Sequence, residues 1–193
     1  MDSVSDPEFR HLSLDEFLGR VSVPEPAPAG GSVAALTAAL AASLCVKAAR
    51  LSARTMNDSA ELATAAGGLR DRAASLCDDD AIVYGEVVEA QRTGDARALA
   101  DALSSAANVP LEVAVVATET AEIAARLAAG GNENLVGDAV TAALLAVAAA
   151  QSAATLVALN LASWPQDERH RRARQLVASA EASGARARQA LAP

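Results

Sequence analysis

Long apolar segments alternate with short polar breaks along the chain, and the breaks carry the signals of helix ends. Ser13 and Glu16 form an S-x-x-E capping box, which predicts a short helix over 14–20. Prolines and a glycine pair exclude a regular helix over 23–31 and predict an extended loop. The apolar pattern then resumes and predicts a long helix over 33–54.

The later breaks divide the rest of the chain in the same way. Further helices are predicted over 59–92, 95–107, 110–129, 135–163 and 166–190. Gly67 and Gly68 predict a bend or break in the first of these, and Pro110 either starts a new helix or kinks a continuous one. The sequence therefore predicts an all-α, single-domain bundle of five to six long helices over 13–193, after a flexible tail over 1–12.

The segment 139–163 carries no charge and is long enough to cross a bilayer. It is rich in alanine, whose transfer into lipid is nearly neutral, so we interpret it as a buried core helix and expect no membrane partner. A helix that is apolar nearly all round in so small a chain also predicts a shared interface. A homodimer is the simplest arrangement.

Composition narrows the fold and the location. Hydrophobic residues make up 52% of the 193 residues and aromatic residues only 2%, which disfavours an all-β protein. Cys45 and Cys77 lie in alanine-rich helical surroundings, so we expect buried free thiols in a reducing compartment. The first ten residues have no apolar core of a secretory signal, and we therefore expect a cytoplasmic protein.

Charge and motifs exclude several functions. The net charge is −8 and the pI is about 4.7, which makes nucleic acid a poor partner. His11 and His170 lack metal-ligand spacing, so no metal site is predicted. The sequence contains no Walker loop, dinucleotide fingerprint or G-x-S-x-G motif.

The first candidate site is the loop that ends in Gly30, Gly31 and Ser32 at a predicted helix start. Free backbone N–H groups and the helix dipole favour an anion or a carboxylate there. The alternative is a turn in which Ser32 caps the helix.

The second candidate site is the run Asp78, Asp79 and Asp80 inside a predicted helix. Successive side chains are 100° apart, so at least one carboxylate points inward or toward a partner. An alanine-rich interior disfavours the charged form, and such a carboxyl group can hold or shuttle a proton. The alternative is a solvated acidic stripe. Tyr84 lies one turn after Asp80, on the same face.

Amides form the third group of candidates. Asn132, Asn134 and Asp138 can cap the next helix or hydrogen-bond a heterocyclic ligand. Asn160 lies deep in the predicted uncharged helix, where a buried amide must find partners. It either ties helices together or contacts a ligand.

Several of these segments occur in an order that resembles the cyclodeaminase domain of the formiminotransferase-cyclodeaminase family, which includes stand-alone methenyltetrahydrofolate cyclohydrolases. The segments are PAPAGGSVAALTAAL (26–40), DDDAIVY (78–84), NVPLEVA (108–114), GNENLVGDAVTAALL (131–145) and LNL (159–161). The resemblance spans about 14–175. It implies an all-α dimer that binds a tetrahydrofolate derivative as substrate in a cleft near the subunit contact.

The resemblance also implies roles for individual residues. Asp80 matches an aspartate that would act as general acid and base in ring closure with loss of ammonia, or in hydrolysis of a methenyl bridge. The match also implies a set of ligand-binding residues, to which we add Tyr84 because it lies one turn after Asp80. The full set is Gly30, Gly31, Ser32, Tyr84, Asn132, Asn134, Asp138 and Asn160. Neither reaction needs a metal cofactor.

The chain departs from the family pattern at several polar positions. Ala29 replaces a third glycine, and 53–60 contains Arg54 as its only cation where a lysine-rich stretch is usual. Leu156 and Ala158 stand where a further asparagine and a basic residue are expected. These losses favour a smaller, less anionic imine- or amidine-like substrate in a repurposed enzyme. The alternative is a non-catalytic helical dimer that binds a small ligand or a protein partner.

Overall fold

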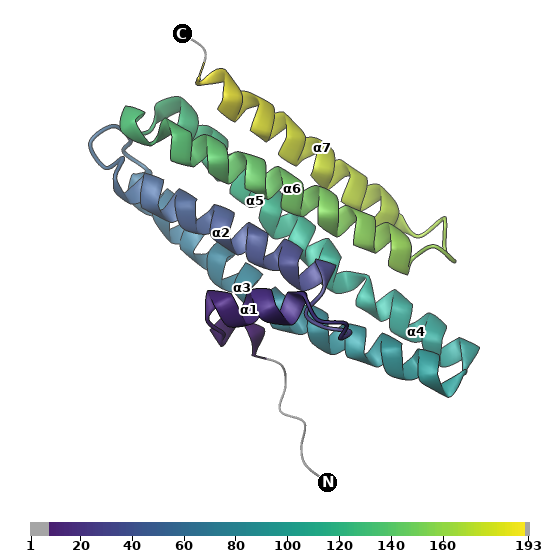
Figure 1. Cartoon of the computed structure of the whole chain (residues 1–193). Helices are drawn as coiled ribbons and strands as arrows, with labels where there is room; N and C mark the ends of the chain where they lie inside the picture. Colours follow the sequence, from purple (N-terminus) through teal and green to yellow (C-terminus); the bar gives the residue numbers. More distant parts are fainter. Residues whose placement is uncertain (1–7, 192–193) are drawn as a thin grey trace.

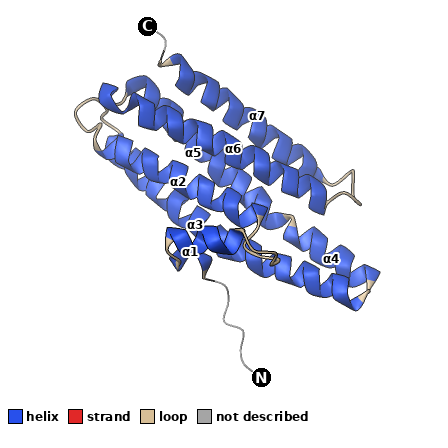
Figure 2. Cartoon of the chain, in the orientation of Figure 1, coloured by secondary structure: helices blue, strands red, loops and turns tan. Residues whose placement is uncertain are grey.

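The computed structural model describes residues 8–191, and all regular structure in this range is helical (Figure 2). The elements are η1 (Phe9–His11), α1 (Leu14–Val21), α2 (Gly30–Arg50), α3 (Ser59–Thr93), α4 (Ala96–Ala106), α5 (Asn108–Gly130), η2 (Glu133–Leu135), α6 (Val136–Asn160) and α7 (Glu168–Gln189). Apart from the short α1, six long helices form the bundle. The predicted all-α fold is confirmed.

The first two helix starts differ in how closely they follow the sequence signals. Both hydrogen bonds of the predicted capping box between Ser13 and Glu16 are present at the start of α1. α2 begins earlier than predicted, at Gly30, with Ala29 as its N-cap and no side-chain cap. The prediction that Ser32 caps this helix is therefore wrong, because its hydroxyl group bonds a side chain from α3 instead.

In the middle of the chain the glycine pair does not break its helix as predicted, whereas Pro110 lies at the start of a new helix, one of the two predicted alternatives. α3 runs unbroken through Gly67 and Gly68, because packing on its neighbours outweighs the low helix propensity of two glycines. It ends at Gly94, whose φ of 72° is in the left-handed region. Pro110 lies in the first turn of α5, where a missing N–H breaks no helical hydrogen bond.

α2, α5 and α6 form the centre of the bundle, with α3 packed on one side and α7 on the other (Figure 1). Their contact faces consist mainly of alanine, and Ala35, Ala38, Ala117 and Ala146 are among the fully buried positions. Small side chains allow helices to approach closely. The core therefore depends on tight backbone approach rather than on large apolar side chains.

α2 and α6 lie antiparallel. Lys47 near the end of α2 pairs with Asp138 near the start of α6 at 2.6 Å. At the opposite end, Val33 and Thr155 line the same open hollow. The two helices thus form one layer whose outer face runs along the length of the bundle.

The outer face of this layer is apolar and largely uncovered within one chain. Three helical segments are long and apolar enough to cross a membrane by length and composition: Gly30–Arg50, Ala96–Gly130 and Glu133–Asn160. Only 39% of the most apolar window of the last segment is buried. The prediction that this helix is wholly a core element is therefore only partly met, since Leu144 and Leu159 are exposed.

Part of the predicted N-terminal tail is structured. Phe9 is buried against the bundle, and Arg10 pairs with Asp78 of α3 at 3.1 Å. Phe17 of α1 is also buried in the same core cluster. Residues 8–12 are thus attached to α3 by apolar contact and an ion pair, whereas 1–7 lie outside the described residues.

Candidate active site

The three successive aspartates of α3 point in three directions. Asp78 faces the N-terminal segment, where it accepts a hydrogen bond from the backbone N–H of Arg10 at 3.3 Å. Asp79 faces α5 and lies 3.8 Å from the guanidinium group of Arg72. Asp80 faces the start of α2. The three directions follow from the 100° step between successive residues of a helix. The aspartates therefore do not form the solvated acidic stripe that was the alternative.

Asp80 is packed against the first turn of α2. Its Oδ2 accepts a hydrogen bond from the hydroxyl group of Ser32 at 3.0 Å. A Cβ placed on Gly31 would lie 1.9 Å from Asp80 Oδ1, so this position accepts no side chain while Asp80 occupies its place. The glycine loop and an aspartate of α3 thus lie in contact, and this contact depends on glycine at position 31.

The surroundings of Asp80 favour its protonated form. Burial raises the pKa of the Asp80 carboxyl group above its ordinary range, while hydrogen bonds from the side chain and backbone of Ser32 act in the opposite direction. Burial also raises the pKa of the Cys77 thiol to about 12, and the charges of Asp78 and Asp80 add to this rise. The Cys77 thiol therefore stays protonated and unreactive beside the carboxyl group.

A carboxyl group in this position can donate or accept a proton beside the first turn of α2. Its partner Ser32 is fully buried and fixes one carboxylate oxygen. Gly30, one residue before the Gly31 contact, lines an open hollow of about 440 Å³ between α2 and α6. The arrangement combines a partly buried carboxyl group, the first turn of a helix and a nearby concave surface.

Asn132, Asn134 and Asp138 lie at the other end of α2. The side-chain amide of Asn132 donates to the Leu51 carbonyl group at 3.1 Å, and its Oδ1 accepts from the backbone N–H of Asn134. Asp138 pairs with Lys47. Lys47 is fifteen residues from Ser32, which is about 22 Å along a helix axis. Within one chain, the structure does not bring these residues to Asp80.

The last two predicted ligand-binding residues take intermediate positions. Tyr84 lies one turn beyond Asp80 on α3, and 43% of it is exposed. Asn160 is the last residue of α6 and is only partly buried. The prediction that Asn160 lies deep in a helix is therefore wrong, because α6 ends three residues earlier than predicted. It lies at the same end of the α2–α6 layer as Gly30.

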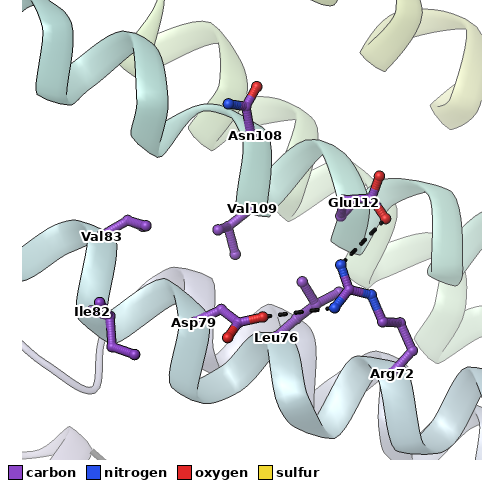
Figure 3. A pocket seen from close by; sticks show the side chains of 8 residues that line it. All are labelled: Arg72, Leu76, Asp79, Ile82, Val83, Asn108, Val109 and Glu112. Carbon is purple, nitrogen blue, oxygen red and sulfur yellow. Dashed lines mark ion pairs between the residues drawn. The ribbon is translucent and has the colours of Figure 1, made fainter. Parts of the chain in front are cut away.

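Sequence reasoning missed a second concave surface, between α3 and α5. We call this hollow of about 310 Å³ the α3–α5 slot (Figure 3). Its charged groups are Arg72, Asp79 and Glu112, Asn108 adds an amide, and its apolar lining includes Leu76, Val83 and Val109. The seven-residue spacing of Arg72 and Asp79 could have indicated a shared helix face. Their proximity to Glu112 depends on how two helices pack.

Other charged residues have structural roles. Arg169, in the first turn of α7, donates to the Ser104 carbonyl group and to Asn108 Oδ1. It therefore fastens α7 to the junction of α4 and α5. Across residues 8–191, no group of three or more His, Cys, Asp or Glu side chains is arranged to hold a metal ion. Cys45 and Cys77 are buried free thiols, as predicted.

The fold and the site define an all-α bundle with a partly buried carboxyl group against the first turn of a helix. The family model described as formiminotransferase-cyclodeaminase matches residues 13–179. The chain belongs to this family, and the resemblance predicted from the ordered motifs is confirmed.

Two relatives place the chain within this family. A methenyltetrahydrofolate cyclohydrolase of Methylorubrum extorquens is 28% identical over 163 residues, which cover 77% of this chain and 78% of the relative. The crystal structure of formiminotetrahydrofolate cyclodeaminase from Thermotoga maritima has a TM-score of 0.85 and 26% sequence identity. That match covers 94% of this chain and 96% of the other. The similarity thus extends over the whole bundle.

Proposed function

We propose that this protein is an enzyme of the cyclodeaminase or cyclohydrolase type that acts on a C–N bond by acid–base catalysis, with Asp80 as the group that transfers the proton. The observation that carries the proposal is the contact between the partly buried Asp80 carboxyl group and the Gly31–Ser32 turn of α2. The family and the names of both relatives support the reaction class.

Both reactions proceed through a tetrahedral carbon between two nitrogen atoms. In cyclodeamination, a ring nitrogen adds to a formimino carbon and the amine leaves as ammonia, which needs a proton on the departing nitrogen. In hydrolysis, water adds to a methenyl carbon and gives up a proton before one C–N bond breaks. A carboxyl group with a raised pKa can donate the first proton and accept the second.

The substrate we propose is 5-formimino- or 5,10-methenyltetrahydrofolate, or a smaller imine or amidine. The two relatives are named for the folate substrates. The sparse cations of 53–60 favour the smaller compounds, because an anionic glutamate tail finds only Arg54 there.

We further propose that the working form is a homodimer built on the outer face of α2 and α6. Leu40 and Leu144 are 55% and 43% exposed on this face. An antiparallel two-fold pairing would bring the Lys47–Asp138 end of one chain to the Asp80 end of its partner. Such pairing would place Asp138 of one chain near Asp80 of the other, although these two predicted site residues lie at opposite ends of the bundle within one chain.

The decisive measurement is turnover by the purified full chain. The absorbance of 5,10-methenyltetrahydrofolate and ammonia release from 5-formiminotetrahydrofolate report the two reactions separately. Asp80→Asn should lower kcat by about 10²–10⁴-fold, the usual contribution of a general acid or base, with unchanged helicity. Asp71→Asn is the matched control, since Asp71 is an exposed aspartate of the same helix. Binding of either folate without turnover would favour the non-catalytic alternative, and unchanged rates in Asp80→Asn would remove Asp80 from the mechanism.

A further inference from the structure

The charged groups of the α3–α5 slot are poorly satisfied by one another. Arg72 lies between two carboxylates, at 3.8 Å from Asp79 and 3.7 Å from Glu112 (Figure 3). These separations are longer than hydrogen bonds, and none of the three side chains makes a hydrogen bond within residues 8–191. By contrast, the neighbouring pair Arg70–Asp71 is closed at 2.8 Å. The slot therefore presents a guanidinium group between two carboxylates in loose, half-exposed ion pairs, which a ligand can replace with closer contacts.

The slot has an apolar part beside these charges. Val83 and Val109 face each other across the hollow, and the ionic groups lie along one edge of it (Figure 3). Leu76 is fully buried beneath them. The volume of about 310 Å³ is at the lower end of small-molecule sites, which span about 300–1,000 Å³. The hollow thus suits a small ligand with one charged end and one aliphatic end.

Charge complementarity selects the charged end. A simple cation would be attracted by Asp79 and Glu112 but repelled by Arg72, and a simple anion would meet the reverse. A zwitterion satisfies both signs, because its carboxylate can bind the guanidinium group while its ammonium group binds an adjacent carboxylate. We propose that the α3–α5 slot binds a small α-amino acid with an aliphatic side chain.

This site is separate from the proposed proton chemistry. Asp79 faces α5, whereas Asp80 faces the start of α2. The inference therefore does not rest on the proposed function, and binding can be measured without turnover.

The test is calorimetric titration of the full chain with L-leucine and with its two halves, 3-methylbutylamine and 4-methylpentanoate. We expect leucine to bind, each half to bind at least about tenfold more weakly, and Arg72→Gln to lose at least about tenfold in affinity, since each ionic hydrogen bond removed costs this much or more. Arg70→Gln and Asp80→Asn should bind leucine as the parent protein does.

Three outcomes would overturn the proposal. These are no binding of leucine at millimolar concentrations, binding of the amine as tight as that of leucine, and equal affinity in Arg72→Gln. Circular dichroism of Arg72→Gln must match the parent protein, and Arg72→Lys supplies a second variant that keeps the charge but loses the planar pair of donors.

Discussion

At the start of α2, the carboxylate of Asp80 occupies the space that a β-carbon on residue 31 would need. The spacing of three aspartates predicted that at least one would point inward or toward a partner. It did not reveal that two do, because Asp78 is buried through its contact with Arg10, which lies far away in the sequence. The family resemblance, rather than the spacing, selected Asp80 among the three.

Gly31→Ala should displace the Asp80 carboxylate and lower both stability and turnover. The added Cβ would approach Asp80 Oδ1 to 1.9 Å. Overpacking of this kind costs about 1–3 kcal/mol of unfolding free energy, measured by urea denaturation.

Gly30→Ala is the matched control for stability, because a Cβ there meets nothing within 4 Å. If the clash with Asp80 is the cause, shortening that side chain in the double variant Gly31→Ala/Asp80→Ala should recover most of the loss. Equal stability of the two single glycine variants would show that Asp80 does not fill this space in solution.

The raised pKa of Asp80 predicts a pH-dependent stability. A carboxyl group whose folded-state pKa exceeds its unfolded value, here ordinarily 3.8, stabilises the fold fully below that value. The contribution is lost as the pH rises through the folded-state pKa. The unfolding free energy of the parent protein minus that of Asp80→Asn should therefore fall as pH increases above about 3.8. Denaturant titrations of both proteins over a pH series measure this difference, and a rise with pH would refute the assignment.

At the scale of the elements, most breaks between helices could be predicted because they depend on local chemistry. The capping box at Ser13, the left-handed Gly94 and the glycine pair at the end of α5 each act within a few residues of the helix end. The errors fall where a distant element intervenes. Ser32 bonds Asp80 instead of capping its helix, and α3 continues through two glycines.

Replacing Gly67 and Gly68 by alanine should therefore stabilise the protein. Both positions lie inside α3, and a Cβ on either meets nothing within 4 Å. Alanine is favoured over glycine in a helix interior by about 0.5–1 kcal/mol per residue. Thermal unfolding should show a higher Tm for the double variant than for the parent protein. A lower Tm would mean that the glycines serve a contact or a motion that α3 needs.

At the scale of the whole molecule, the uncovered α2–α6 face is the main feature that one chain leaves unexplained. Leu40 and Leu144 are exposed on it, and the hollow at one end is lined by residues that include Ser152 and Thr155. We propose that a second copy of the chain covers this face, in the antiparallel pairing described above.

Leu40→Glu and Leu144→Glu should convert a dimer into a monomer. Each places a charge in the centre of the proposed contact, where its desolvation is unfavourable. Light scattering coupled to gel filtration should give the mass of two 19.5 kDa chains for the parent protein and of one for the variants. Leu191→Glu, at an exposed position near the chain end, should stay dimeric. A monomeric parent protein, or one that binds lipid vesicles through this face, would contradict the pairing.

A mixing experiment asks whether the dimer completes the site. If Asp80 acts with Asp138 of the partner subunit, Asp80→Asn and Asp138→Asn should each be inactive alone. Mixing and refolding them together should restore activity, because one of the two sites in a mixed dimer carries both aspartates. Activity of Asp138→Asn equal to that of the parent protein would exclude this sharing.

The sequence alone determined the helical fold and most helix boundaries, because alanine content, apolar periodicity and helix-end signals act over a few residues. It also determined the family, because the motifs and their order along the chain can be recognised without a structure. Only the tertiary structure decided which aspartate meets which partner, why residue 31 must be glycine, and that Arg72 lies beside Glu112. These depend on how helices far apart in sequence rotate and pack against each other. A rotation of one residue step changes the direction of a side chain by 100°, and only the packed neighbours fix that angle.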